Sequence, residues 1–89
     1  MRKIAESFLM GHPDKLCDQV ADTILDEFLR RDKETRANIE VFAGHGAMMI
    51  SGEVDSRADF DVGQIAKKVY KDAGYDDEIE PFVHLGSLK

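Results

Sequence analysis

The sequence contains little cysteine, proline or tryptophan and no long apolar run. Its 89 residues include one cysteine, two prolines and no tryptophan. The single cysteine, Cys17, excludes an internal disulfide and any metal site built from several cysteines, as is typical of a reducing compartment. The longest evident apolar run, Ala47–Ile50, is too short for a signal peptide or a membrane span. We therefore expect a cytoplasmic protein that makes no use of a membrane.

Basic residues are also in deficit. Twelve lysines and arginines stand against 18 acidic residues, for a formal net charge of -6. Nucleic acids and anionic lipids repel such a chain unless it carries a concentrated basic patch, and none is visible. We expect no nucleic-acid partner. A chain of this length builds one hydrophobic core, so residues 1–89 are interpreted as a single domain.

Hydrophobic periodicity predicts two helices. The first runs from Pro13 to about Arg31, where apolar residues recur every four positions at Leu16, Val20, Ile24 and Phe28. Cys17 lies on the same face, so it is interpreted as a small core residue rather than a nucleophile. The second helix covers residues 62–73, after several possible caps in 55–61, and is closed by Gly74.

Strand patterns account for the rest of the chain. Strands are predicted over residues 1–9, 37–43, 47–54 and 78–87. The glycine-histidine-glycine run at 44–46 predicts a tight hairpin turn, and Pro81 predicts an edge position for the last strand. The resulting order is β-α-β-β-α-β. This order predicts an α+β fold of two layers, in which both helices cover one face of a sheet.

The strand over 47–54 also predicts self-association. Met48, Met49 and Ile50 are apolar on both faces of this strand, so helices on one side would leave the other side uncovered. So small a domain has a thin margin of stability, and association is a common remedy. We expect a homo-oligomer formed through the sheet face, or partner subunits.

A glycine, a histidine and a proline precede the first helix. Free backbone N–H groups and the positive end of the helix dipole make such a start an anion site, to which His12 adds a donor. Asp14 in the same turn is suited to Mg²⁺ that bridges phosphate oxygens. The alternative is that Pro13 and Asp14 only start the helix. Further aspartates follow Asp14 at four-residue intervals and form a stripe along the helix. On this alternative the residues of the stripe, Asp18, Asp22 and Asp26, simply face water.

Two glutamates fall on adjacent strands of the predicted hairpin. Glu53 follows Gly52, which permits close approach of a ligand or another backbone. Paired carboxylates such as Glu40 and Glu53 can bind a cation or an ammonium group. The alternative is ordinary alternation on a solvent-facing strand. His45 and His84 are interpreted as surface residues.

Two stretches resemble a known family. They are "ESFLMGHPDKLCDQVADTILDEFLRRD" and "GHGAMMISGEVDSRADFDVGQIAKKVYKDAGYDD". Together they resemble the N-terminal domain of S-adenosylmethionine synthetase (methionine adenosyltransferase), over a match from about Glu6 to Asp77. The resemblance implies an enzyme that makes S-adenosylmethionine from ATP and methionine with the help of Mg²⁺ and K⁺.

The same resemblance implies roles for five residues. His12 would contact the phosphates and Lys15 lies in the same motif, so these two are the catalytic candidates. Asp14 would hold Mg²⁺ and Glu40 would be the carboxylate of the K⁺ site. Glu53 would bind the amino group of methionine, with His12 as the second substrate-binding residue.

The chain also departs from the family pattern. Met10 replaces the glutamate that usually precedes Gly-His-Pro, and Gly44 stands where a lysine is usual. The family enzyme has three such repeats, and this chain amounts to one. We expect a unit that is incomplete alone and needs partner chains. One alternative is a non-catalytic binding or assembly module that keeps the fold, and another is a piece cut from, or encoded beside, a longer enzyme.

Overall fold

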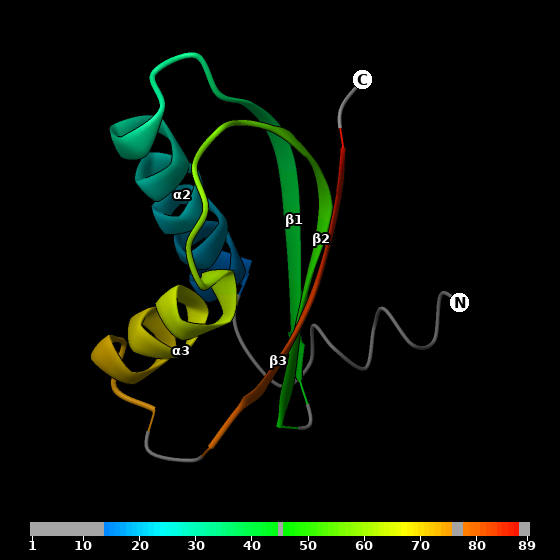
Figure 1. Cartoon of the computed structure of the whole chain (residues 1–89). Coiled ribbons are helices and arrows are strands. Elements are labelled where there is room, and N and C mark those ends of the chain that lie inside the picture. Colours follow the sequence, from blue (N-terminus) through cyan, green and yellow to red (C-terminus); the bar gives the residue numbers. More distant parts are fainter. Residues whose placement is uncertain (1–13, 45, 76–77, 88–89) are drawn as a thin grey trace.

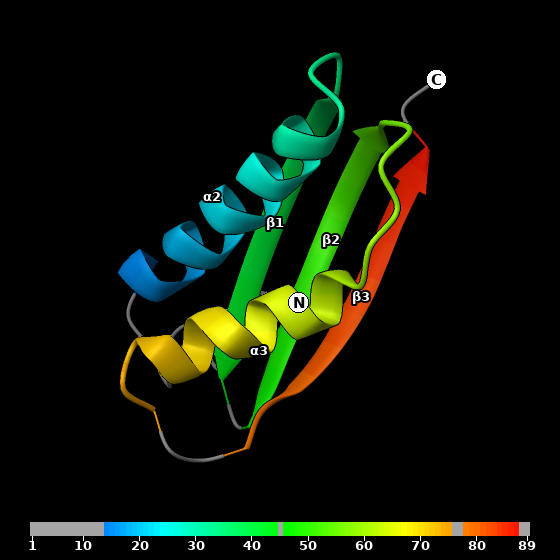
Figure 2. The ribbon, with the colours of Figure 1, turned by 60° about the vertical axis from the view of Figure 1, so that its left-hand side comes forward.

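Two helices and three strands make up the part of the chain that the computed structural model describes, which is residues 14–44, 46–75 and 78–87. In chain order they are α2 (Asp14–Arg31), β1 (Arg36–Gly44), β2 (Ala47–Asp55), α3 (Val62–Asp72) and β3 (Glu80–Ser87). Both helices cover the same face of the sheet (Figures 1 and 2). The predicted two-layer α+β fold is confirmed over these residues, and the strand predicted over 1–9 lies outside them.

The sheet has the strand order β1-β2-β3. The strands β1 and β2 form an antiparallel hairpin closed by the pair Gly44 and Ala47, as the sequence predicts. The strands β2 and β3 are parallel, so the chain must cross from one end of the sheet to the other between them. Helix α3 makes this crossover (Figure 2).

Among the described strands, β3 lies at an edge of the sheet, the position that Pro81 predicts. The backbone N–H of Glu80 donates to the carbonyl of Gly46 at 2.9 Å, on the β2 side. Because peptide groups alternate in direction along a strand, those of Pro81 point to the opposite side. Its missing N–H therefore costs no hydrogen bond to β2.

Helix α2 carries the predicted core face. Its buried residues are Leu16, Cys17, Val20, Ile24 and Phe28. The aspartates at positions 18, 22 and 26 are exposed, as expected for a solvated stripe. Among the described residues, no helix has the length and apolar character needed to cross a membrane.

Helix α3 begins at a cap that the sequence offered among several. Asp61 is the N-cap, and its Oδ1 accepts a hydrogen bond of 3.1 Å from the backbone N–H of Gln64. The helix ends at Asp72, one residue before the predicted end, with Ala73 as the C-cap. Gly74 follows with φ of +101°, a conformation that glycine adopts without strain.

The core lies between the helices and the inner face of the hairpin. Met48 and Ile50 of β2 are fully buried, whereas Met49 between them points to the other face and is 41 % exposed. Gly52 allows a close backbone approach in the same strand. It has φ of +136°, and a Cβ placed there would lie 1.8 Å from the carbonyl oxygen of Asn38.

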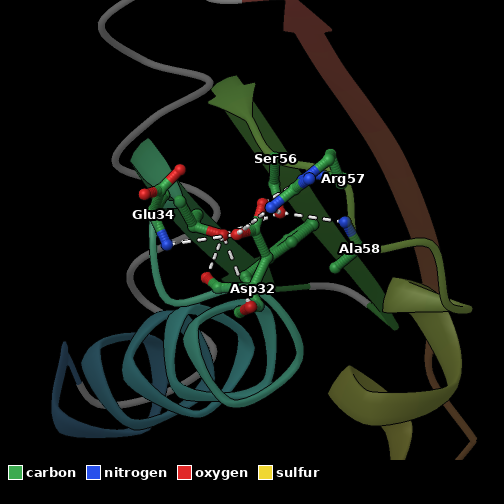
Figure 3. A network of polar contacts seen from close by, with 7 residues as sticks. Asp32, Glu34, Ser56, Arg57 and Ala58 are labelled. Atoms are coloured by element: carbon green, nitrogen blue, oxygen red, sulfur yellow. Dashed lines mark hydrogen bonds and ion pairs between the residues drawn. The ribbon is translucent and has the colours of Figure 1, made fainter.

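A polar network joins the end of α2 to the loop before α3 (Figure 3). A carboxylate oxygen of Asp32 accepts from the backbone N–H of Arg57 at 2.8 Å, and the other accepts from the N–H of Glu34 at 3.1 Å. Thr35 donates from Oγ1 to the hydroxyl of Ser56 at 2.7 Å. Two loops distant in the sequence are thus tied together by side chains.

Candidate functional site

The face of the sheet turned away from α2 and α3, which we call the outer face, is organised in rows across the three strands. Strand register sets these rows, because paired residues of neighbouring strands share a face. One row is apolar and contains Phe42, Met49 and Phe82. The next contains Glu40, Ser51 and His84, and the third contains Asn38, Glu53 and Gly86.

Glu40 and Glu53 lie diagonally across the hairpin. Glu40 pairs with Ser51 and Glu53 pairs with Asn38, so the two glutamates are on adjacent strands and on one face. Both are exposed. Diagonal neighbours of this kind are about 7–8 Å apart at Cα. Their carboxylates and the Ser51 hydroxyl present oxygen atoms, which are the ligands that hard cations prefer, and the carboxylates also suit an ammonium group.

His84 belongs to the same group, although the sequence indicated only a surface histidine. It is exposed, and it shares a row with Glu40, with Ser51 between them. The sequence carries no signal for this placement, because the row depends on which strand β3 pairs with. The outer face therefore offers two carboxylates, a hydroxyl and an imidazole within two adjacent rows.

Two of the remaining candidates, Asp14 and Lys15, lie at the start of α2. Asp14 is its first residue, and the exposed Lys15 follows. His12 falls outside the described residues. Since α2 covers the inner face of the sheet, the helix start and the outer-face glutamates belong to different layers (Figure 1). The structure thus brings Glu40 and Glu53 together and leaves Asp14 and Lys15 apart from them.

Metal-ligating side chains are not clustered in the part of the chain that the structure describes. Within residues 14–44, 46–75 and 78–87, no group of three or more histidine, cysteine, aspartate or glutamate side chains is placed to hold a metal ion. A hollow of about 320 Å³ lies beside Lys67, Lys71, Tyr75 and Glu80. Of the site residues whose side chains the structure describes, Lys15, Glu40 and Glu53 do not line it.

Two carboxyl groups of the helix layer and its adjoining loop have their pKa values lowered by hydrogen bonds. Hydrogen bonds from Arg30, and next from Arg31, lower the pKa of the Glu27 carboxyl on α2. The hydrogen bond from the Arg57 backbone, and next that from Glu34, lower the pKa of Asp32. These shifts have structural causes, so we assign no chemical role to these groups.

The chain is similar in sequence to proteins of one known family. Residues 2–85 match the family described as S-adenosylmethionine synthetase, N-terminal domain. The chain is 45 % identical over 74 residues to the S-adenosylmethionine synthase of Mycoplasma capricolum and 46 % identical over 74 residues to that of Tropheryma whipplei (strain Twist). Each match covers 83 % of this chain and 19 % of the relative. The chain thus spans about a fifth of the length of these curated relatives.

A solved structure shares the fold. It is described as an unusual S-adenosylmethionine synthetase from Campylobacter jejuni, and it superposes with a TM-score of 0.81 at 35 % sequence identity. The superposition covers 89 % of this chain and 24 % of that chain. The likeness therefore extends over nearly all of the present chain and a minor part of its relative.

Proposed function

The chain belongs to the S-adenosylmethionine synthetase family, and we propose that it contributes the N-terminal part of a methionine adenosyltransferase site that other chains complete. The observation that carries the proposal is that Glu40 and Glu53 are diagonal neighbours on adjacent strands of the outer face. These are the two carboxylates that the family resemblance assigns to K⁺ and to the methionine amino group. We expect the proposed reaction to take place in the cytoplasm.

The outer-face glutamates have chemistry that fits these roles. An exposed carboxylate on a rigid strand attracts an ammonium group, and we assign this role to Glu53. Glu40 supplies oxygen ligands for K⁺, with the Ser51 hydroxyl next to it in the same row. Placement on strands holds both groups more rigidly than placement on loops would.

The phosphate end of the proposed site is the start of α2. This helix has 18 residues, so its N-terminus presents a full helix dipole and free N–H groups to an anion. We propose that Asp14 holds Mg²⁺ there, that Lys15 adds positive charge, and that His12 contacts the phosphates of ATP. Bound Mg²⁺ would neutralise the charge of the departing phosphates as the methionine sulfur attacks C5′ of the ribose.

The separation of these two groups supports a site shared between chains. Asp14 and Lys15 belong to the helix layer, and Glu40 and Glu53 face away from it. One substrate can touch both groups if the outer face of one chain meets the helix start of another. We therefore propose a homo-oligomer through the outer face, or partner subunits that supply the parts this chain lacks.

A second function is favoured by one specific observation. Met49 is 41 % exposed and Phe82 is 55 % exposed in the apolar row of the outer face, which is a surface suited to protein contact. Met10 and Gly44 replace polar residues that are usual in the family. A non-catalytic assembly module that keeps the fold would retain the apolar row and lose ligand binding.

Calorimetric titration with a non-hydrolysable ATP analogue, with and without Mg²⁺, distinguishes these functions. The variants are Asp14→Ala and, as a matched control, Asp18→Ala, which removes an exposed carboxylate one turn later on the same helix. The proposed function predicts Mg²⁺-dependent binding that only Asp14→Ala abolishes. Absence of binding at millimolar nucleotide, or equal loss in both variants, would favour the assembly module.

A further inference from the structure

The strand β3 exposes apolar side chains on both of its faces. Phe82 points to the outer face and is 55 % exposed. Val83 pairs with the fully buried Ile50 on the helix side, yet it is 43 % exposed itself. Strands that are apolar on both faces are typical of sheets whose two faces are both covered. The free side of β3 therefore leaves apolar surface on both faces, which contact with another chain would cover.

The backbone along this side carries hydrogen-bonding groups that no described strand uses. Peptide groups alternate, and those of Val83, Leu85 and Ser87 point away from β2, as do those of Pro81. Of the strands that the structure describes, only β2 pairs with β3. Natural edge strands are often protected by charged side chains, but residues 81–87 contain no lysine, arginine, aspartate or glutamate. Pro81 removes a donor at its own position only.

We propose that a second copy of this chain pairs with β3, edge to edge and antiparallel, so that the two sheets become continuous. A two-fold axis at His84 sets Val83 opposite the partner's Leu85, and these two exchange a pair of hydrogen bonds. Ser87 then donates to the carbonyl of the partner's Pro81. In this register every outward N–H of residues 83–87 has an acceptor, and the missing donor of Pro81 falls at the end of the paired segment.

Charge and shape favour this occupant. The chain is acidic, so two copies repel wherever carboxylates meet, as they would along the aspartate stripe of α2 or around Glu40 and Glu53. The edge over residues 81–87 has no carboxylate. In the proposed register Phe82 also lies over the partner's Gly86, where no side chain obstructs the ring, and Val83 meets the partner's Leu85 on the helix side. This interface differs from one through the outer face, so it does not depend on the proposed function.

Cysteine cross-linking tests the register. Residues of a non-hydrogen-bonded antiparallel pair have Cα atoms about 4.5 Å apart, which lies in the range that a disulfide requires. His84→Cys should therefore form a disulfide-linked dimer on mild oxidation. Phe82→Cys and Val83→Cys should not, because the same residues of the two copies are then displaced along the strand. The unaltered chain, whose one cysteine is buried, is the background control. Preferential cross-linking at 82 or 83 would overturn the register.

Sedimentation velocity over a range of concentrations tests the association itself. Val83→Lys places two charges at the proposed interface and should weaken the dimer roughly tenfold or more. Leu29→Lys removes a partly exposed apolar residue from α2 and should leave the affinity of the dimer unchanged. A chain that stays monomeric at millimolar concentration, or a dimer equally stable in both variants, would overturn the proposal. The nucleotide titration tests the proposed function independently of this association, so either proposal can fail without the other.

Discussion

Asp32 and Arg57 are joined by a hydrogen bond of 2.8 Å from the backbone N–H of Arg57 to a carboxylate oxygen of Asp32, across 25 positions of sequence. This contact fixes the end of α2 against the loop that leads into α3 (Figure 3). The Asp32 side chain is only 8 % exposed, so a water molecule replaces its partners poorly. The pair therefore joins the segment that follows one covering helix to the segment that leads into the other.

Acid should weaken this contact. The folded pKa of Asp32 is lowered chiefly by the Arg57 hydrogen bond, so its stabilising effect is complete above the ordinary carboxyl pKa near 3.8. That stabilisation decreases as the pH falls through the lower, folded pKa. We expect Asp32→Asn to lower the melting temperature at neutral pH and to flatten its decline in acid. Thermal melts across this pH range, with Asp26→Asn as an exposed control, would show it; identical pH profiles would contradict it.

Substitution at Gly52 should be costly. A Cβ there would lie 1.8 Å from the Asn38 carbonyl oxygen, and φ of +136° is strained for any other residue. Backbone strain of this kind costs about 1–3 kcal/mol, and relief of the clash must add to it. We expect Gly52→Ala to lower the free energy of unfolding, measured in urea, by at least that amount. Gly86→Ala, measured in dilute protein so that the proposed dimer is dissociated, is the control, since its nearest neighbouring atom within the chain is 3.9 Å away. An equal loss there would refute the explanation.

Adjacent methionines should differ sharply in their contributions. Met48 is fully buried in the core, so Met48→Ala leaves a cavity and should cost about 2–5 kcal/mol of unfolding free energy. Met49 is 41 % exposed on the outer face, and Met49→Ala in dilute protein should cost far less. Urea unfolding of the two variants measures the difference. Similar losses would mean that the alternation of β2 is wrong.

Glu53 should matter for methionine and little for folding. Its side chain is exposed, and no other described residue makes an ion pair with it. We expect Glu53→Gln to weaken methionine binding roughly tenfold or more, since an ion pair to the amino group is lost, while the melting temperature is retained. Glu34→Gln, another exposed glutamate, is the control in the same calorimetric titration. Equal affinity in both variants would remove Glu53 from the site.

The elements that the sequence predicts well are those set by neighbouring residues. The four-residue spacing of Val20 and Ile24 is enough for α2, and the two-residue link after Gly44 is enough for the hairpin. Asp61 was one of several possible caps, and only the geometry selects it. Local pattern therefore determines the kind of each element and most of its bounds.

Pairing between distant segments could not be predicted in this way. Nothing in the alternation around His84 shows that β3 lies beside β2 in parallel, so the row that His84 shares with Glu40 was missed. The bond of Asp32 to Arg57 likewise depends on how the loop after β2 returns toward the end of α2. The roles of His12 and Asp14 remain predictions from the family resemblance.

The parallel pairing of β2 with β3 has a consequence for the order of folding. Strands β1 and β2 are separated by two residues, and hairpins of this kind form within about 1–10 μs. Strand β3 can dock only after the whole segment 56–79 has been laid across the sheet, which is a longer loop to close. Until then the edge of β2 that later pairs with β3 is exposed, and this strand carries the apolar Met48 and Ile50. We expect the nascent chain to be most prone to aggregation in this interval.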